Sequence, residues 1–217
     1  GEHLERTQKA LDCWAEVLTR DATNTEARWE MRTLFIKEER TEELMDVDLE
    51  LLELFSEDEP RRVLIYCELG RQYDLQESTE EAVTAWQSAL QLSPGLEEPV
   101  ERLLEIFSDR EDWSEYVLIL NQKAEHCVDP DERLILCVQL AELYEVQLDQ
   151  SEVAIAVYLQ VLESIPNHLE AYEHLERLYR QLEQWEHLIN LLLSRLEVTD
   201  DLLDRQEVYE RIADVFE

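Results

Sequence analysis

The side chains that could do chemistry in this chain are mostly carboxylates. The 217 residues include 53 Asp and Glu, against 19 Lys and Arg and 5 His. With carboxylates this dense, two of them fall close together by chance, so a pair does not by itself predict general acid–base catalysis. Three glycines leave little material for a phosphate-binding loop, and the sequence has neither a GxSxG nor an HExxH motif. These features predict a protein that is not an enzyme and has no cofactor.

Histidines and cysteines are the other side chains that could bind a metal. His126, Cys127, Asp129 and Cys137 lie in one short segment. They flank an expected loop, however, and Cys137 matches a core position of the repeat described below, so we expect packing there and no metal site. Three further histidines do not share one helical face and are expected on the surface: His168, His174 and His187.

The four cysteines are scattered along the chain without a CxxC pair: Cys13, Cys67, Cys127 and Cys137. In a chain of this size, such cysteines are typical of reduced residues in a protein core. Reduced thiols favour a cytoplasmic location, since disulfides form in oxidising compartments.

The net charge of −34 restricts the partners that the chain can bind. Nucleic acids bind proteins largely through Lys and Arg, which release counterions from the phosphates. We therefore expect neither nucleic acid nor an anionic membrane surface as a partner, and we expect a basic peptide or protein. The alternative, that the acidity only keeps the protein soluble, stays open at this point.

The composition indicates an all-α fold. Gly and Pro are rare, with 3 and 5 residues, and the chain is rich in good helix formers. No apolar run approaches the roughly 20 residues that a membrane-spanning helix needs.

A repeat runs through the whole chain. Aromatic residues that follow Leu- and Ile-rich stretches recur every 34 to 38 residues, and every second one is 71 or 72 residues apart: Phe35, Tyr73, Phe107, Tyr144, Tyr179 and Phe216. A second ladder keeps a step of 72 residues: Ala10, Ala82 and Ala154, then Trp14, Trp86 and Tyr158. Small residues thus align with small ones and large aromatics with large ones, which predicts a double repeat of about 72 residues.

Each repeat is expected to contain two antiparallel amphipathic helices. Ser78 and Glu81 have the spacing of a capping box at the start of a second helix. Pro60 and Pro130 are expected in the first turns of other helices, and Pro94 and Pro166 just beyond helix ends. Counted over the chain, the pattern predicts twelve helices. The tryptophans that follow the repeat are interpreted as packing residues: Trp14, Trp86, Trp113 and Trp185.

The segment Tyr66-x-x-Leu69-Gly70-x-x-Tyr73, followed by Ala82, Trp86, Ala89 and Pro94, resembles the tetratricopeptide repeat (TPR). Every second repeat is degenerate and lacks the small residues and the proline. The resemblance implies a right-handed superhelical solenoid of antiparallel helix pairs that forms a single domain over residues 1–217. Small residues such as Gly70, Ala141 and Ala213 are expected to let helices approach closely. The first and last helices align with half repeats, so we expect a fragment of a longer protein whose uncapped ends can self-associate.

In TPR proteins the first helix of each pair lines a concave surface along which peptides lie. Carried over by alignment, the resemblance implies these groove residues here: Trp29, Arg71, Glu98, Glu101, Glu105, Glu142, Glu145, Glu170, Glu173 and Arg177. The alignment also turns Cys67 toward the groove. Trp29 is expected either to stack on a ligand or to belong to an N-terminal interface.

The resemblance implies a scaffold that binds a protein segment. Because the groove carries Glu where a clamp for a C-terminal carboxylate needs Lys or Asn, we expect a basic segment instead. Two other functions stay open. The chain is alternatively a structural segment of a long solenoid that stacks or self-assembles, or an acidic chaperone or nucleic-acid mimic for basic proteins.

Overall fold

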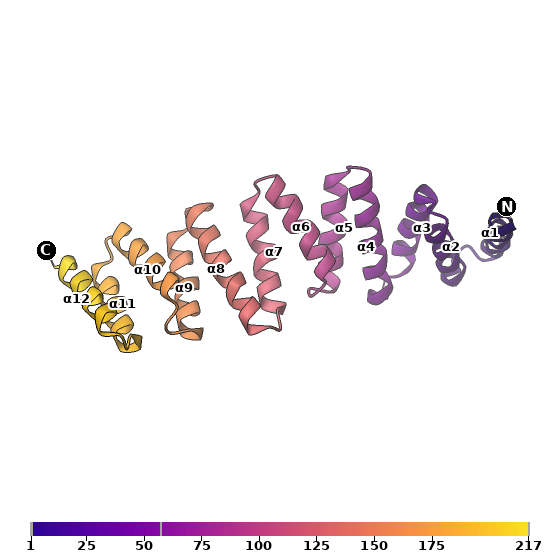
Figure 1. The fold of residues 1–217 in the computed structure, drawn as a ribbon. Helices are drawn as coiled ribbons and strands as arrows, with labels where there is room; N and C mark the ends of the chain where they lie inside the picture. Colours follow the sequence, from indigo (N-terminus) through magenta and orange to yellow (C-terminus); the bar gives the residue numbers. More distant parts are fainter. Residues whose placement is uncertain (1, 57, 217) are drawn as a thin grey trace. The chain divides into compact units, whose positions relative to one another are not determined.

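The computed structural model describes residues 2–56 and 58–216, with side chains from residue 5 onward. These residues form helices and no strand, so the all-α fold class is confirmed (Figure 1). The expected number of helices is also confirmed for the described part of the chain, with these bounds: α1 Glu2–Arg20, α2 Thr25–Lys37, α3 Thr41–Leu54, α4 Glu59–Leu75, α5 Thr79–Leu92, α6 Glu97–Asp109, α7 Trp113–His126, α8 Pro130–Val146, α9 Ser151–Ser164, α10 Leu169–Gln181, α11 Trp185–Val198 and α12 Leu202–Val215.

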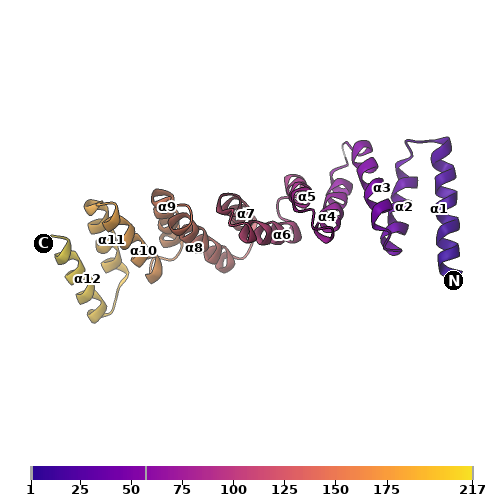
Figure 2. The same ribbon diagram turned by 90° about the horizontal axis from the view of Figure 1, so that it is seen from above.

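The chain divides into two compact units, unit 1 over residues 1–106 and unit 2 over residues 107–217. Within each unit, most helices that follow one another in the chain pack side by side, for example α4 with α5 and α8 with α9 (Figure 2). This arrangement is typical of repeat proteins, in which each helix pair contacts its neighbours. The expectation of one superhelical domain over residues 1–217 stays a prediction.

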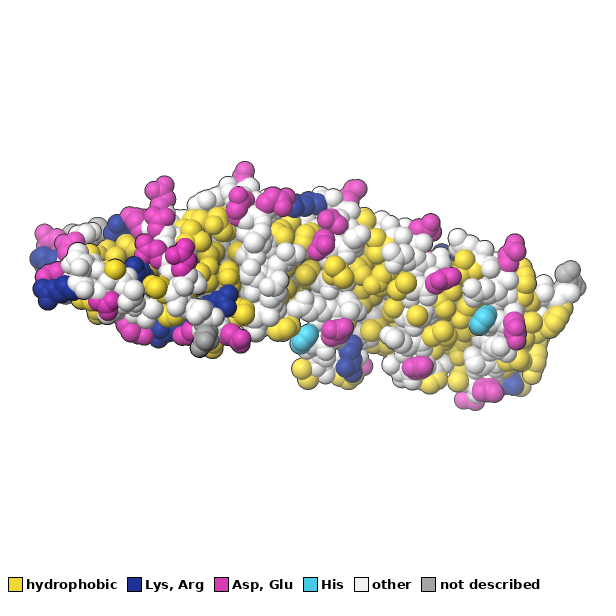
Figure 3. Space-filling model, turned by 180° about the vertical axis from the view of Figure 1, so that it is seen from behind, with side chains coloured by type: hydrophobic (Ala, Val, Ile, Leu, Met, Phe, Trp, Pro, Cys, Tyr) yellow, Lys and Arg dark blue, Asp and Glu magenta, His cyan; other side chains and the backbone are white. Residues whose placement is uncertain are grey.

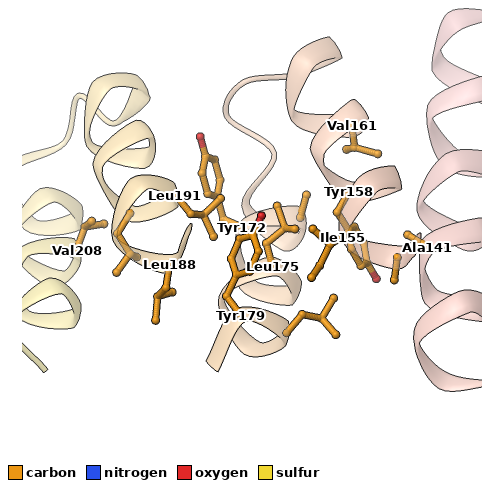
Figure 4. Close-up of a cluster of buried hydrophobic side chains, with 14 of the residues drawn as sticks. Ala141, Ile155, Tyr158, Val161, Tyr172, Leu175, Tyr179, Leu188, Leu191 and Val208 are labelled. Atoms are coloured by element: carbon orange, nitrogen blue, oxygen red, sulfur yellow. The ribbon is translucent and has the colours of Figure 1, made fainter. Parts of the chain in front are cut away.

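The aromatic and small residues of the repeat lie where the two helices of a pair meet. In unit 1, Trp86 is fully buried against Gly70, and a Cβ atom on Gly70 would lie only 2.5 Å from two carbons of the indole ring. In unit 2, Ala141 and Tyr158 hold the equivalent positions and are both fully buried, within the core drawn in Figure 4. The expectation that small residues permit a close approach of helices is confirmed at these two pairs.

The same place in the α2–α3 pair holds a buried ion pair. Arg32 lies three residues before Phe35, so it holds the repeat position of Gly70, which lies three residues before Tyr73. Asp48 follows Arg32 by the same number of residues as Trp86 follows Gly70, so it holds the repeat position of Trp86. The Nε atom of Arg32 lies 2.6 Å from Oδ1 of Asp48, and Asp48 is completely buried. Its Oδ2 atom has no hydrogen-bond partner among the described residues. A charge pair therefore replaces the aromatic contact in this degenerate repeat.

Every helix pair turns through one residue in the left-handed region, and that residue is acidic in each case: Glu39, Glu77, Glu111, Asp149 and Glu183, with φ between 52° and 58°. The backbone N–H after each of them donates to the carbonyl of the aromatic residue in the preceding helix, for example from Ser78 to Tyr73 at 2.9 Å. These hydrogen bonds are typical of the Schellman motif. The aromatic ladder of the sequence therefore marks the ends of the first helices.

Because Cβ atoms crowd the backbone in the left-handed region, Gly is favoured there. We expect Glu77→Gly to raise the free energy of unfolding by about 1 kcal/mol. Glu81→Gly inside α5 should lower it by a similar amount, since Gly is a poor helix former. Urea denaturation of the two variants checks this, and a loss of stability in Glu77→Gly would contradict the strained-turn interpretation.

The capping box predicted for Ser78 and Glu81 is wrong. Ser78 is the N-cap of α5, but its side chain makes no capping hydrogen bond, because the Schellman turn already orders the backbone there. Aspartates cap other helices instead. The carboxylates of Asp58, Asp112 and Asp201 accept backbone hydrogen bonds at the starts of α4, α7 and α12. Both Pro60 and Pro130 lie in first turns, as expected.

Several packing assignments need correction. Trp185 is 47% exposed at the start of α11, because this pair has Leu188 and Leu192 in its core. Cys13 is an exposed thiol and not a core residue, whereas Cys67 is only 7% exposed and so does not face a groove. Ala213 lies exposed on α12, since no described second helix packs on that helix.

Candidate partner-binding face

Some residues predicted for the groove of unit 1 are paired with each other. The guanidinium of Arg71 on α4 holds both carboxylate oxygens of Glu98 on α6, at 2.6 and 2.5 Å, and also bonds Glu68 at 2.9 Å. The hydrogen bond from Arg71 holds the pKa of Glu98 below its usual range. This bidentate pair joins two first helices, so Glu98 is not a free carboxylate for a partner.

Glu105 is also paired within α6, with the guanidinium of Arg102. Arg102 further bonds Asp74 at 3.0 Å, and Asp74 accepts a hydrogen bond of 3.1 Å from the indole N–H of Trp86. Glu101 is exposed and forms no ion pair with the described residues. Of the three glutamates predicted on α6, only Glu101 thus offers its charge to solvent without an ionic partner among the residues that the structure describes.

Trp29 packs inside unit 1. Its ring meets Phe55 edge to face at 5.9 Å, and the guanidinium groups of Arg32 and Arg61 lie over it at 4.9 and 5.1 Å. These contacts use the ring faces that a ligand would stack on. The structure therefore shows Trp29 as a packing residue beside the core of unit 1.

Glu145, predicted for the groove of unit 2, lies mostly buried. It pairs with Arg177 at 2.5 Å and with Nδ1 of His174 at 3.1 Å, and the hydroxyl of Tyr158 lies 3.5 Å away. The ring of His174 stacks on Tyr158 with centroids 4.8 Å apart. Burial and the nearby Glu145 raise the pKa of Tyr158. Glu145 occupies the register of Asp74 in unit 1, and its role is to hold α8, α9 and α10 together.

Three predicted glutamates of unit 2 are exposed and form no ion pair with the described residues. We call Glu142 on α8 and Glu170 and Glu173 on α10 the acidic row. The contacts of Glu145 with His174 and Arg177 bring α8 and α10 side by side, so these carboxylates belong to neighbouring first helices. Carboxylates on adjacent helices reinforce one another's field and attract cations.

A hollow of about 480 Å³ adjoins the acidic row at Glu142, which is the member of the row in its wall. Its wall combines aromatic, aliphatic and ionic side chains, which include Trp113, Tyr116, Glu142, Val146, His174 and Arg177. Val146 is well exposed there, and Trp113 and Tyr116 meet edge to face at 5.7 Å. The hollow has the size of one or two amino-acid side chains and suits a partly apolar segment that carries positive charge.

Two further hollows were not predicted from the sequence, and they are equivalent. One of about 380 Å³ lies among α3, α4 and α5, and the other, of about 520 Å³, among α9, α10 and α11. Each is walled by two tyrosines of the first helix and two leucines of the preceding second helix, Tyr66, Tyr73, Leu49 and Leu52 in unit 1 and Tyr172, Tyr179, Leu159 and Leu162 in unit 2. These residues share the same repeat positions in the two units, and this is the sequence signal from which the two hollows could have been predicted.

The histidines have structural roles in the described part of the chain. The side chain of His168 caps α10 by accepting from the backbone N–H of Ala171, and His187 stacks on Tyr179 at 5.6 Å. Among the described residues there is no group of three His, Cys, Asp or Glu that could hold a metal ion.

Figure 3 shows carboxylates spread along the visible face, with apolar side chains between them.

The comparisons with known proteins concern the fold. No protein-family profile and no curated protein matches the chain. Among solved structures, a chain of Naa15/Naa10 bound to HypK-THB is similar over 99% of this chain, with a TM-score of 0.54 and 16% identity. This chain spans only 34% of that one. YrrB, a TPR protein with an unusual peptide-binding site, is similar over 91% of this chain and 97% of its own, with a TM-score of 0.42 and 16% identity.

The predicted repeat of antiparallel helix pairs is confirmed at the level of the fold, which is similar to that of the Naa15/Naa10 chain. None of the described helices is long and apolar enough to cross a membrane.

Proposed function

We propose that this protein is a non-catalytic scaffold that binds a basic protein segment along the first helices of unit 2. The observation that carries the proposal is the acidic row. Glu142, Glu170 and Glu173 stay exposed and form no ion pair within the described part of the chain, whereas the neighbouring Glu145 is neutralised by Arg177. The partly apolar hollow beside Glu142 supplies a place for a side chain of the partner, which a surface that only keeps the protein soluble does not need.

The fold supports the proposal, because helix pairs of this kind offer a long surface of exposed first helices. YrrB is described as having a peptide-binding site, and the Naa15/Naa10 structure contains bound HypK. The excess of carboxylates over basic side chains favours a basic partner. The four free thiols support a cytoplasmic setting.

The test is a binding measurement with a labelled twelve-residue peptide of alternating Arg and Ala. In the variant Glu142→Gln/Glu170→Gln/Glu173→Gln we expect the Kd to rise about tenfold or more, since three attractive charges are lost and each 1.4 kcal/mol is a factor of ten. Fluorescence anisotropy at 50 and 200 mM salt gives both affinities and their salt dependence.

A matched control changes three exposed glutamates of second helices in the same unit: Glu125→Gln/Glu152→Gln/Glu186→Gln. This control changes the net charge by the same amount. If binding depends on the position of the carboxylates rather than on the net charge, the Kd of the control should stay within about twofold of the wild-type value. Equal weakening in both variants would instead favour the acidic-chaperone function, in which any polycation binds to the overall charge. Unchanged binding in both would reject the basic-segment proposal.

A further inference from the structure

One arginine of unit 2 is buried without a partner. Arg195 on α11 lies twelve residues after the left-handed turn residue Glu183. The same position in three other second helices is apolar and buried, with Leu51 in α3, Ala89 in α5 and Val161 in α9. Arg195 is only 8% exposed, and its buried Nη1 atom has no hydrogen-bond partner among the described residues. An unpaired charge at a buried position is costly, which favours a role in binding.

Arg195 lies in the wall of another hollow, of about 340 Å³, among α10, α11 and α12. Its guanidinium is 5.9 Å from the ring centre of Tyr172 on α10. The hydrogen bond from Arg211 and, to a smaller extent, the charge of Arg195 hold the pKa of Glu207 on α12 below its usual range. The guanidinium of Arg195 thus lies near both Tyr172 and Glu207, which also line the hollow. Because Arg211 bonds Glu176 of α10 at 2.8 Å, this side of α12 packs within unit 2.

Carboxylates make up much of the remaining wall of this hollow. Three of them are exposed and form no ion pair with the described residues: Glu173, Asp200 and Asp204. Two others already have partners, since Glu207 pairs with Arg211 and Asp201 caps α12. Within the described part of the chain, the hollow therefore combines one unpaired guanidinium with three unpaired carboxylates. A simple anion would be repelled by the carboxylates, and a simple cation would leave Arg195 without a partner.

We propose that this hollow, which we call the Arg195 site, binds a free amino acid with a basic side chain, such as arginine or lysine. The α-carboxylate of the ligand accepts hydrogen bonds from the guanidinium of Arg195 and supplies the partner that the buried charge lacks. The α-ammonium and the side-chain cation of the ligand lie among the unpaired carboxylates, so each charged group meets one of opposite sign. The volume of about 340 Å³ lies in the range of small-molecule sites, about 300–1,000 Å³.

The test is isothermal titration calorimetry of the whole chain with L-arginine and with agmatine, which is arginine without its carboxylate. We expect the wild type to bind arginine about tenfold more tightly than agmatine or better, since a hydrogen bond between charged groups is worth at least that factor. Arg195→Met keeps the apolar stem and removes the guanidinium, so it should abolish or reverse the preference. Three other second helices carry apolar residues at this position, so circular dichroism should show unchanged helix content.

A second variant tests the acidic part of the Arg195 site. Asp200→Asn/Asp204→Asn changes two exposed residues and should weaken the binding of both ligands about tenfold while the preference for arginine stays. Its matched control is Glu152→Gln/Glu186→Gln, which changes the net charge equally at exposed positions of second helices and should bind both ligands as the wild type does.

Three results would each overturn the proposal: no binding of arginine below about 1 mM, equal binding of agmatine by the wild type, or a preference that persists in Arg195→Met. The proposal does not rest on the scaffold function. Since these variants leave Glu173 and the rest of the acidic row unchanged, binding of the basic peptide is a separate readout.

Discussion

At pH 8, removing either partner of the buried ion pair in unit 1 should cost about 3–5 kcal/mol of unfolding free energy. The variants are Arg32→Met and Asp48→Leu, each of which leaves the other charge buried. The pair has little access to water, since Asp48 is fully buried and Arg32 almost so. An uncompensated charge there is far more costly than the pair itself.

The double variant Arg32→Met/Asp48→Leu should recover most of this loss, because apolar residues of similar volume often replace a buried ion pair without cost. Such a result fits the α4–α5 and α8–α9 pairs, which have the apolar contacts of Trp86 with Gly70 and of Tyr158 with Ala141 at this position. Guanidinium denaturation of the four proteins gives the coupling energy. If each single variant lost less than about 1 kcal/mol, the pair would not be buried as described.

The pH dependence of the unfolding free energy of the same proteins is a second readout. Burial raises the pKa of Asp48 from its ordinary value of 3.8 to about 7, although Arg32 opposes the shift. Because the folded carboxyl binds its proton more tightly than the unfolded one, its contribution to stability is complete below about pH 4 and is lost as the pH rises through 7. The unfolding free energy of the wild type relative to that of Asp48→Leu should therefore decrease as the pH rises from about 4 to about 7.

Gly70→Ala should destabilise the protein by about 2–3 kcal/mol, although Ala is the better helix former. The added Cβ atom would lie 2.5 Å from the Trp86 ring, so the indole or the helix must move. Gly95→Ala is the matched control, since its Cβ atom would meet nothing within 4 Å, and it should change the stability by less than about 0.5 kcal/mol.

The double variant Gly70→Ala/Trp86→Tyr should regain much of the stability, because it copies the pair Ala141 and Tyr158 of unit 2. The tyrosine hydroxyl would replace the indole N–H that now donates to Asp74, as Tyr158 approaches Glu145. Thermal unfolding of the single and double variants checks this. A double variant no more stable than Gly70→Ala would show that the pairs of the two units are not interchangeable.

The fold could be predicted from the sequence because one period governs both the aromatic and the small residues. Ala82, Trp86 and Ala154 identify the second helices, and Tyr73 and Tyr144 mark the ends of the first ones. The buried ion pair could not be predicted, since Arg32 and Asp48 are charged residues at positions that hold Gly70 and Trp86 in the repeat closest to the regular pattern. The two charged residues are recognised as a pair only when the repeat register of α2 and α3 is compared with that of the other helix pairs.

The candidate site could be predicted only in part. Alignment placed Glu142, Glu170 and Glu173 on exposed faces, but it could not show that Glu98 and Glu145 are neutralised by arginines. Those arginines come from other helices, so the pairs depend on tertiary packing rather than on spacing in the chain. The same limit applies to Trp29, whose ring is contacted by Arg32 of α2, by Arg61 of α4 and by Phe55 just after α3.

The most direct measurement maps the residues of the protein that contact a bound basic peptide. A peptide of alternating Arg and Ala that carries one benzoylphenylalanine can be photo-crosslinked to the whole chain and mapped by mass spectrometry. The proposed scaffold function predicts cross-links on α8 and α10 near the acidic row, and their loss at high salt. Cross-links concentrated on α9 and α11, or spread evenly over all helices, would contradict it.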